Sequence, residues 1–394
     1  MKNSEENISK LNKYFEYRDT ISVDIVDLVK TLAINNGANI KKTKGVDILE
    51  KILPNKKHTI FVVLDGFGYF KLSKLDKESI LKQNVKMRIK TVNPTSTACV
   101  LTSIVSASYP NEHGIYGWWD YNRDYKLGYY PLLLKERKTG EELSKKGIEA
   151  SDIFEFVSVF NKMKSKVNIY ENREIINSEF TKMFAGNNNR YGYYSVKEVF
   201  TKMSSKLKSE SEKTFNYLYI DGLDEASHMY GVDSKQVNDL ILEVEEGIKH
   251  LLAENEDVSI VLTADHGQVD MTSMLYLNQN IDFNKYFYAL PTMDTRMINF
   301  FVKDEFKKEF EENFMKEFGE DAILFTKDEA KEYKLFGTDS YTKRADKSLG
   351  EYIAVIVNNK FMVCDKLTQE DSMHTKGNHS GLTKEEITVP LVIF

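Results

Sequence analysis

Residues 258–266 read VSIVLTADH, a run of β-branched and other apolar residues that ends with an acid and an imidazole side by side. A continuous apolar run of this length is typical of a strand covered on both faces, as in a parallel sheet flanked by helices. Burial of Asp265 and His266 is costly unless they are paired or bind a cation. The stretch therefore predicts a parallel sheet with a polar site at the end of one strand.

Three further apolar runs support the same fold. They are TIFVVL (59–64), NYLYI (216–220) and ITVPLVIF (387–394). Between two of them, residues 234–252 repeat apolar side chains at the spacing of a helix with one buried face. Strands that alternate with helices define the α/β class. We therefore expect a mostly parallel sheet flanked by helices.

The residue composition and the apolar pattern change along the chain, which predicts three parts. Residues 1–57 form a helical N-terminal extension. Residues 58–270 together with 371–394 form the α/β core. Residues 271–370 combine predicted helices rich in Phe, Lys and Glu with short predicted strands. They form a smaller inserted α+β subdomain.

Composition restricts the class of protein. With 41% hydrophobic and 29% charged residues, the chain falls in the ordinary soluble globular range. Its 54 basic and 60 acidic side chains give a net charge of −6, so neither a nucleic-acid polymer nor an anionic membrane is an expected partner. No secretory signal or membrane span is recognisable. Two cysteines, Cys99 and Cys364, suit a reducing compartment, and we expect a cytoplasmic protein whose oligomeric state stays open.

Polar residues follow the predicted strands, where open α/β sheets bind their ligands. Any single one of them is more often a turn former or a helix cap than a ligand. Together they form a set of three Asp and three His side chains. The set is Asp65, Asp224, His228, Asp265, His266 and His379.

Such a mixed nitrogen and oxygen set suits zinc, with manganese as a second candidate. Six side chains are too many for one tetrahedral ion, which predicts two adjacent metals. Paired metals about 3.5 to 4 Å apart can stabilise both the attacking and the leaving oxygen in a displacement at phosphorus. A nucleophile should therefore lie nearby.

The stretch NPTSTACVLTSIV (93–105) offers that nucleophile. Pro94 suits the first turn of a helix, where free N–H groups favour an anion. The spacing alone does not choose among the hydroxyls of Thr95, Ser96 and Thr97. A cluster of helix-capping residues is the alternative explanation.

The order of these motifs resembles a known family. In sequence they are LDGFG (64–68), PTST (94–97), HGI (113–115), DEASHMYG (224–231), TADHG (263–267) and GNH (377–379). Over residues 57–394 the chain resembles bacterial members of the type I phosphodiesterase/nucleotide pyrophosphatase branch of the alkaline phosphatase superfamily. The resemblance implies an alkaline-phosphatase-like fold, two zinc ions, and hydrolysis of phosphodiesters or nucleotide pyrophosphates through a covalent phosphothreonine.

The resemblance also distributes the ligands. It implies one metal on Asp65, Thr97, Asp265 and His266. It implies a second on Asp224, His228 and His379. Thr97 becomes the nucleophile, and His113 has a structural role in a turn. The remaining histidines match nothing in the family and are expected at the surface or in packing: His58, His250 and His374.

The sequence departs from the family where the phosphate should be held. Eukaryotic-type members follow the nucleophile with Phe-Pro-Asn, whereas this chain has Ala98, Cys99 and Val100. Phosphate must then be held by the metals, the helix N-terminus or another residue, and the substrate is not implied. A phosphomonoesterase of the same superfamily is the first alternative function. A non-catalytic phosphate-binding protein that kept the fold is the second.

The charge and the aromatic content of the sequence around the candidate nucleophile favour a phosphodiester as the substrate. Lys and Arg are absent from residues 93–119, so a monoester dianion finds no extra cation there. Trp118 and Trp119 lie in a run of aromatic residues that could stack a nucleobase. A loop packed by its own aromatic side chains is the alternative. We expect a small phosphate-ester substrate, with a nucleotide as one candidate.

Overall fold

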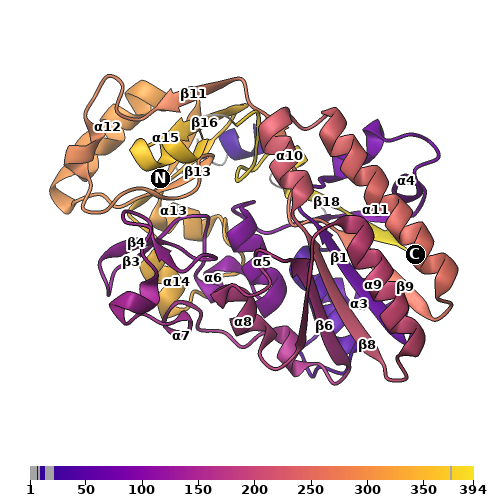
Figure 1. Cartoon of the computed structure of the whole chain (residues 1–394). Coiled ribbons are helices and arrows are strands. Elements are labelled where there is room, and N and C mark those ends of the chain that lie inside the picture. Colours follow the sequence, from indigo (N-terminus) through magenta and orange to yellow (C-terminus); the bar gives the residue numbers. More distant parts are fainter. Residues whose placement is uncertain (1–6, 8, 14–21, 373–374) are drawn as a thin grey trace.

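The computed structural model describes residues 7, 9–13, 22–372 and 375–394. Its centre is a seven-stranded sheet with the order β2-β18-β9-β1-β8-β6-β7 (Figure 1). β18 runs antiparallel to both of its neighbours, and the other pairs, from β9 to β7, are parallel. The strands are β1 (His58–Leu64), β2 (Val85–Lys90), β6 (Lys166–Asn172), β7 (Asn189–Tyr193), β8 (Thr214–Ile220), β9 (Val258–Thr263) and β18 (Thr388–Ile393). The predicted α/β class with a mostly parallel sheet is confirmed.

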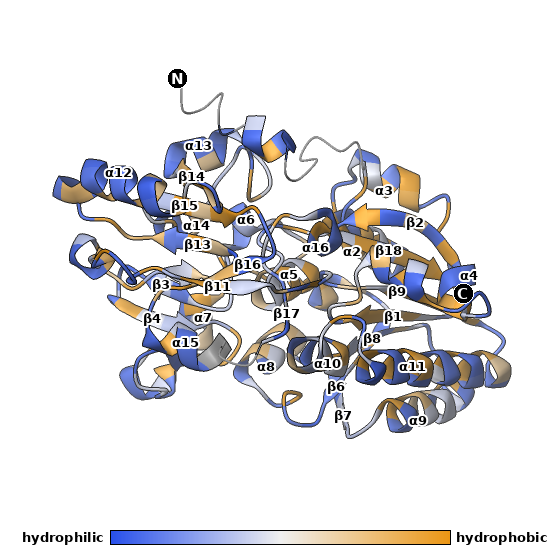
Figure 2. Ribbon diagram, turned by 90° about the horizontal axis from the view of Figure 1, so that it is seen from above, coloured by the Kyte–Doolittle hydropathy of each residue, from blue (hydrophilic) through white to orange (hydrophobic). Residues whose placement is uncertain are grey.

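Four of the five interior strands are buried along their whole length. Every residue of β1, β8, β9 and β18 is buried, which explains why their sequences read as continuous apolar runs. Figure 2 shows hydrophobic colouring along β1, β9 and β18 at the middle of the α/β core. β2 lies at an edge, and only Ile89 of its six residues is buried.

Helices cover the sheet. They are α2 (Ile25–Asn35), α3 (Lys44–Leu49), α4 (Ile80–Gln83), α5 (Thr97–Ser106), α6 (Pro110–His113), α7 (Ala150–Ile153), α8 (Glu179–Ala185), α9 (Val196–Ser209), α10 (Gly222–Tyr230), α11 (Lys235–Glu254) and α16 (Lys384–Ile387). α11 begins after Ser234, whose hydroxyl accepts a hydrogen bond from the Val237 amide. It matches the helix expected over 234–252 and lies beside α9 in both ribbon views (Figures 1 and 2).

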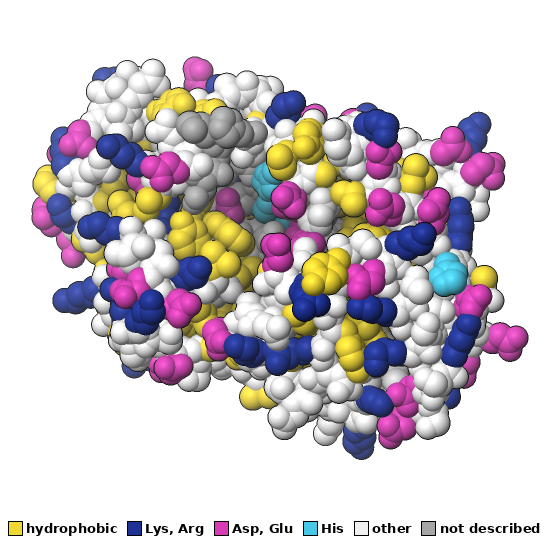
Figure 3. Space-filling model, viewed as in Figure 1, with side chains coloured by type: hydrophobic (Ala, Val, Ile, Leu, Met, Phe, Trp, Pro, Cys, Tyr) yellow, Lys and Arg dark blue, Asp and Glu magenta, His cyan; other side chains and the backbone are white. Residues whose placement is uncertain are grey.

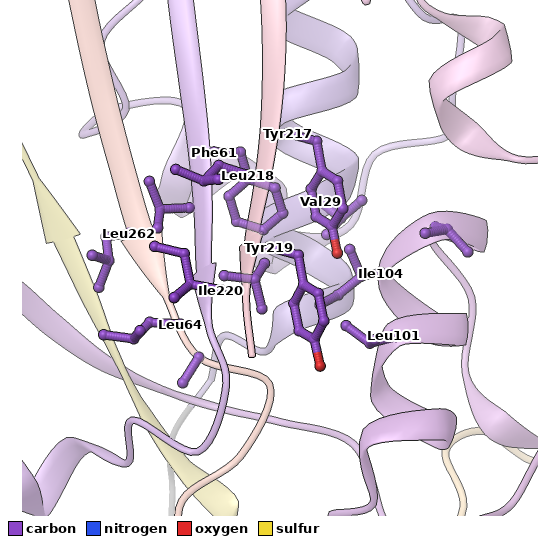
Figure 4. Packing of buried hydrophobic residues seen from close by; sticks show 14 of the residues in the cluster. Val29, Phe61, Leu64, Leu101, Ile104, Tyr217, Leu218, Tyr219, Ile220 and Leu262 are labelled. Atoms are coloured by element: carbon purple, nitrogen blue, oxygen red, sulfur yellow. The ribbon is translucent and has the colours of Figure 1, made fainter. Parts of the chain in front are cut away.

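The packing of α5 on the sheet determines where its N-terminus lies. Figure 4 shows Leu101 and Ile104 of α5 beside Tyr217 and Tyr219 of β8, together with Val29 of α2. All five side chains are at most 5% exposed. This contact fixes α5 against the centre of the sheet, so that its first turn reaches the ends of β1 and β9.

Residues 271–370 contain a second hydrophobic cluster. A four-stranded antiparallel sheet, β12-β13-β15-β14, packs with phenylalanines of α12, including Phe310 and Phe314 (Figure 1, upper left). Its elements are β12 (Thr292–Met293), β13 (Met297–Phe300), α12 (Lys307–Phe318), β14 (Ala322–Thr326), α13 (Lys327–Glu332), α14 (Lys343–Ser348) and β15 (Tyr352–Ile356). The division of the chain into three domains stays a prediction.

Short elements complete the fold. A three-stranded sheet is formed by β3 (Asp120–Asn122), β4 (Leu127–Tyr130) and β5 (Lys135–Glu136). Two strand pairs join β10 (Val269–Asp270) to β17 (Gly377–Asn378), and β11 (Ser273–Tyr276) to β16 (Lys360–Val363), which precedes α15 (Lys366–Ser372). The 3₁₀ helices are η1 (Tyr69–Lys74), η2 (Leu143–Lys146), η3 (Val159–Lys162), η4 (Phe283–Tyr286) and η5 (Asp304–Phe306).

Two features bear on the expectations from composition. None of the helices in the described ranges has the length and apolar character needed to cross a bilayer. Cys99 and Cys364 are buried and do not form a disulfide. Localisation itself stays a prediction.

Candidate metal and catalytic site

Three neighbouring strands bring the predicted ligands together. β9, β1 and β8 are adjacent and parallel, so their carboxyl ends meet at one edge of the sheet. Asp65 follows β1, Asp265 and His266 follow β9, and α10, which carries Asp224, begins two residues after β8. Gly66 makes the approach possible, because its φ is +75° and a Cβ there would lie 3.3 Å from the Asp224 Cα.

The six Asp and His side chains form one cluster. His266 Nε2 lies 3.4 Å from Asp65 Oδ1 and 3.3 Å from Asp265 Oδ2. Asp224 lies on the other side, with its carboxylate oxygens 3.3 Å from His228 Nε2 and 3.6 Å from His379 Nε2.

Two groups within the cluster could each hold an ion. They are Asp224 with His228 and His379, and Asp224 with Asp65 and His266; the ligand atoms of each group lie within 4.8 Å of one another. The first group matches the ligands expected for the second metal. In the other group the carboxylate of Asp224 stands beside Asp65 and His266, so Asp224 lies between the two positions.

The three histidines point the same nitrogen into the cluster. His228 Nδ1 lies 2.7 Å from the Gly377 carbonyl, and His379 Nδ1 lies 2.7 Å from the Thr95 carbonyl. His266 Nδ1 lies 3.3 Å from the Gly267 carbonyl. Because a carbonyl only accepts, each Nδ1 carries the proton and each Nε2 is left with a lone pair for a metal.

Buried donors orient the carboxylates. Tyr219 donates its hydroxyl proton to Asp65 Oδ2, and the Gln268 amide donates to Asp224 Oδ1. Asp265 Oδ1 accepts from the backbone amides of Gly66, at 3.1 Å, and His266, at 2.8 Å. The sequence reasoning missed Tyr219 and Gln268, because neither carries a spacing signal of its own.

The electrostatics of the cluster fit a bound cation. Asp65 Oδ1 and Asp265 Oδ2 are buried without a hydrogen-bond partner. Burial raises the pKa of Asp265 to about 6. It also raises the pKa of Asp65 well above its ordinary value, helped by the nearby charges of Asp265 and Asp224. Buried carboxylates with free oxygens are unfavourable unless a cation compensates them, and the donor set suits a divalent metal.

The structure separates the three candidate hydroxyls. Thr97 is the first residue of α5, and its Oγ1 lies 3.1 Å from His266 Nε2. Ser96 is the N-cap residue but donates its hydroxyl proton to Asp294 Oδ2 at 2.9 Å. Thr95 donates to the Gly381 carbonyl at 2.9 Å. Pro94 precedes the cap, so the expectation that it lies in the first turn is wrong; the turn begins three residues later.

A cavity of about 560 Å³ opens in front of Thr97. In Figure 3 a histidine side chain lies in a hollow between the two halves of the molecule, next to hydrophobic and acidic side chains. The residues that line the cavity are Ser96, Thr97, Trp118, Trp119, Asp224, Glu225, His228, Met229, Asp294, Thr295, Glu370, Thr375, Asn378 and His379. A larger groove of about 960 Å³ lies within residues 276–369 and contains none of the predicted ligands.

The two tryptophans of this cavity differ in how far their rings are exposed. Trp119 is 4% exposed, and the guanidinium of Arg137 covers its ring at 4.4 Å. Trp118 is half-buried and leaves more of its ring accessible. Tyr116 and Tyr129 from the same aromatic run are buried, so part of that run packs the loop itself.

The remaining histidines lie apart from the cluster. His113 is buried, accepts a hydrogen bond from the Ile115 amide and contacts the Ser103 hydroxyl, and burial lowers its pKa to about 3. His58 is buried at the start of β1, and His250 is exposed on α11. His374 lies outside the described residues.

Comparisons with known proteins agree with this geometry. Residues 59–382 match the family model described as type I phosphodiesterase/nucleotide pyrophosphatase. No curated protein sequence matches the chain. Among solved structures, murine ectonucleotide pyrophosphatase/phosphodiesterase 5 is similar with a TM-score of 0.63 and 15% identity, over 84% of this chain and 87% of that one. An inactive variant of that protein in complex with AMP has a TM-score of 0.62.

A bacterial structure is similar as well. Phosphonoacetate hydrolase from Sinorhizobium meliloti, in complex with phosphonoformate, has a TM-score of 0.59 and 14% identity. The similarity covers 86% of this chain and 90% of that one. At these identities the structural matches establish the fold.

Proposed function

Since this chain belongs to the type I phosphodiesterase/nucleotide pyrophosphatase family, we propose that it hydrolyses phosphodiesters or nucleotide pyrophosphates with Thr97 as the nucleophile. One observation carries the proposal. The hydroxyl oxygen of Thr97 lies 3.1 Å from His266 within the Asp and His cluster, whereas the hydroxyls of Thr95 and Ser96 are bonded elsewhere.

We assign two zinc ions to the cluster, with manganese as a second candidate. Asp65, Thr97, Asp265 and His266 would hold one ion, and Asp224, His228 and His379 would hold the other. Bound there, a pair of divalent cations would lower the pKa of the Thr97 hydroxyl and neutralise negative charge on the phosphoryl and leaving oxygens.

The chain itself supplies the nucleophile and the oxyanion donors. Thr97 Oγ1 forms a bond to phosphorus while the bond to the leaving group breaks, and the leaving group departs with the electron pair. Water then attacks the phosphothreonine, the bond between phosphorus and Oγ1 breaks, and a proton from that water restores the hydroxyl. Ser96 does not cap α5 with its side chain, so the N–H groups of the first turn can receive phosphoryl oxygens in place of the missing Asn.

The substrate we favour is a diester. Among the described residues that line the cavity there is no Lys or Arg to bind the second charge of a monoester. Half-buried Trp118 offers a flat apolar surface for an aromatic leaving group or a nucleobase. The complex of a similar protein with AMP makes a nucleotide a reasonable first substrate to assay. With two buried free cysteines we also propose a cytoplasmic location.

Substitution at Thr97 tests the proposal. We expect Thr97→Ala to abolish hydrolysis of bis(p-nitrophenyl) phosphate while zinc content and fold remain, and Thr97→Ser to keep part of the activity because it retains a hydroxyl. Ser106→Ala, which removes a hydroxyl at the other end of α5, is the matched control and should stay active. An active Thr97→Ala variant would contradict the assignment.

A parallel assay separates the alternatives. The diester should be hydrolysed faster than p-nitrophenyl phosphate. Preference for the monoester by tenfold or more, about 1.4 kcal/mol in transition-state binding, would instead favour a phosphomonoesterase. Absence of all turnover in the zinc-loaded protein would favour a non-catalytic phosphate-binding protein.

A further inference from the structure

The N-cap residue of α5 does not cap its own helix. Ser96 has the extended backbone of an N-cap residue, with φ −104° and ψ 135°, and it is 1% exposed. At such a position a serine hydroxyl usually accepts a hydrogen bond from the amide two or three residues on, here Ala98 or Cys99. The Ser96 hydroxyl accepts from neither. The amides in the first turn of α5 are therefore left without a side-chain cap, directly beside Thr97.

Other helices of the chain show the usual arrangement. α4, α8, α9 and α11 also begin after a serine, and in each of them the hydroxyl accepts from the amide three residues on. At α4, Ser79 does so although it also donates to Glu245, so a carboxylate partner does not by itself prevent capping. What differs at α5 is the direction in which the partner holds the hydroxyl.

The partner of Ser96 is Asp294, a half-buried residue between β12 and β13. Its Oδ2 accepts the Ser96 hydroxyl proton at 2.9 Å, and its Oδ1 accepts from the Thr295 amide at 2.8 Å. The bond turns the Ser96 side chain toward the inserted segment, residues 271–370, and away from the amides of α5.

The turn that carries Asp294 is fixed on the walls of the cavity. Met293 exchanges both backbone hydrogen bonds with Trp119, at 2.9 and 3.1 Å. The Thr295 hydroxyl accepts from the Asn378 side chain at 3.1 Å. Trp119 and Asn378 both line the cavity. The Asp294 carboxylate is therefore held in a fixed place beside the first turn of α5.

We propose that Asp294 is a positioning residue for the phosphoryl site: by accepting the Ser96 hydroxyl proton it holds that hydroxyl away from the first turn of α5, and so leaves the amides there to the phosphoryl oxygens. The proposal rests on the proposed binding of phosphoryl oxygens at these amides and adds the residue that keeps them free. It also gives the inserted segment a part in the reaction, although none of the proposed metal ligands lies in it.

A double-mutant cycle tests this. Inorganic phosphate is the probe, and its dissociation constant is measured by calorimetry with full-length, zinc-loaded protein. We expect Asp294→Ala to weaken phosphate binding by about fivefold, the size of an N-cap hydrogen bond, because the freed Ser96 hydroxyl then caps α5. Adding Ser96→Ala to Asp294→Ala should restore the affinity to that of the unmodified protein or above, because no hydroxyl is left to compete.

Other roles for Asp294 give other results. If only its negative charge matters, Asp294→Ala should tighten phosphate binding, since like charges repel. If Asp294 only supports the fold or the dipole of α5, Asp294→Ala should weaken binding, and Ser96→Ala should not restore it. Either result would overturn the proposal.

Two further variants complete the comparison. Asp294→Asn keeps the size of the side chain and leaves one oxygen for Ser96 and the Thr295 amide; we expect a smaller loss of the same sign, again reversed by Ser96→Ala. Glu225→Gln removes an exposed acid of the same cavity on α10, and should leave phosphate binding equal or tighter. A fivefold loss in Glu225→Gln as well would count against a role specific to Asp294.

A crystal structure of the Asp294→Ala variant detects the same change directly. The Ser96 Oγ should lie within about 3.2 Å of the amide nitrogen of Ala98 or Cys99. A hydroxyl that keeps its present direction would contradict the proposal.

Turnover of bis(p-nitrophenyl) phosphate separates this inference from the proposed function. If the unmodified protein does not hydrolyse the ester but the phosphate cycle shows the expected reversal, the hydrolase proposal fails while the role of Asp294 stands. If the ester is hydrolysed but Asp294→Ala binds phosphate as tightly as the unmodified protein, the hydrolase proposal stands and the role of Asp294 is refuted.

Discussion

At the scale of single residues, the Asp65 carboxylate depends on a tyrosine behind it. Tyr219 is 4% exposed and donates its hydroxyl proton to the carboxylate oxygen that faces away from His266. The hydrogen bond fixes the rotation of the carboxylate, so that the other oxygen remains in the cluster. Partners of this kind commonly change metal affinity by about 10- to 100-fold.

We therefore predict that Tyr219→Phe weakens zinc binding by about tenfold or more while the fold is kept. Competition with a chromogenic chelator measures this without reference to activity. Tyr193→Phe is the control, because Tyr193 is equally buried and donates to the Tyr219 carbonyl but does not touch a ligand. Equal zinc affinity in the two variants would rule out a specific role for the Tyr219 hydroxyl.

A second residue makes stability depend on pH. Glu171 is buried in β6, and desolvation raises the pKa of its carboxyl from 4.5 to about 8, although Thr181 donates a hydrogen bond to it. A raised pKa means that the folded protein binds the proton more tightly than the unfolded chain does. The contribution of Glu171 to stability is therefore full below pH 4.5 and is lost as the pH rises through about 8.

Glu171→Gln removes this dependence. We compare the free energy of unfolding of the variant with that of the unmodified protein at pH 5 and at pH 9. We predict that the difference, variant minus unmodified, is larger at pH 9 than at pH 5 by at least about 1.4 kcal/mol, the equivalent of one pKa unit. Urea unfolding at the two pH values measures the change. A difference between the two proteins that stays constant with pH would mean that Glu171 ionises normally in the fold.

At the scale of elements, one residue just before α5 binds the loop that carries His379. The Thr95 hydroxyl donates to the Gly381 carbonyl and accepts from the Ser380 amide at 3.0 Å. Its carbonyl receives the His379 ring proton at 2.7 Å. Thr95, whose hydroxyl looked equivalent to that of Thr97 in the sequence, thus connects the segment before α5 to the loop of His379, a proposed metal ligand.

Thr95→Val keeps the shape of the side chain and removes the hydrogen bonds of its hydroxyl group. We predict a loss of about 1 to 3 kcal/mol in unfolding free energy, since buried backbone groups lose their partner, together with weaker zinc binding. Thr102→Val is the control on the same helix, because its hydroxyl bonds only to the Ala98 carbonyl. Zinc binding that is unchanged in Thr95→Val would show that the loop is positioned by other contacts.

At the scale of the whole molecule, a buried ion pair joins the inserted segment to the C-terminal part of the core. Arg296, between β12 and β13, and Glu386, in α16, are both 0% exposed. The guanidinium donates to the two carboxylate oxygens at 2.8 and 3.0 Å. Glu386 also accepts a hydrogen bond from the amide of Gly381, two residues after His379. The ion pair therefore helps to position the loop that carries His379.

We predict that Glu386→Gln destabilises the protein by about 3 to 5 kcal/mol, because it leaves the buried guanidinium without a counter-charge. Chemical denaturation measures this. The neighbouring Glu385→Gln changes an acid that forms no ion pair among the described residues, and should cost little. Similar stabilities for the two variants would mean that water reaches and solvates Arg296.

Sequence reasoning recovered the four fully buried strands of the sheet but missed three others. β6 is interior, yet the buried Asn168 and Glu171 break its apolar run, and their polar atoms are satisfied by Asn216 and Thr181 from other elements. β2 and β7 lie at the two edges and mix polar with apolar residues. A strand prediction that relies on the pattern of apolar residues fails where a buried polar side chain is hydrogen-bonded by residues distant in the sequence.

The sequence by itself determined the α/β class, the helix over 234–252 and the set of Asp, His and Thr residues that the fold brings together. These follow from local causes: apolar runs require burial on both faces, and polar groups can be tolerated just beyond the ends of such strands. The tertiary structure alone decided which hydroxyl faces the cluster, which donors orient the carboxylates, and that Asp294 accepts the Ser96 hydroxyl proton. The hydrogen bond of Thr97 with His266 joins residues 169 positions apart, and only the order of strands in the folded sheet brings such residues within bonding distance.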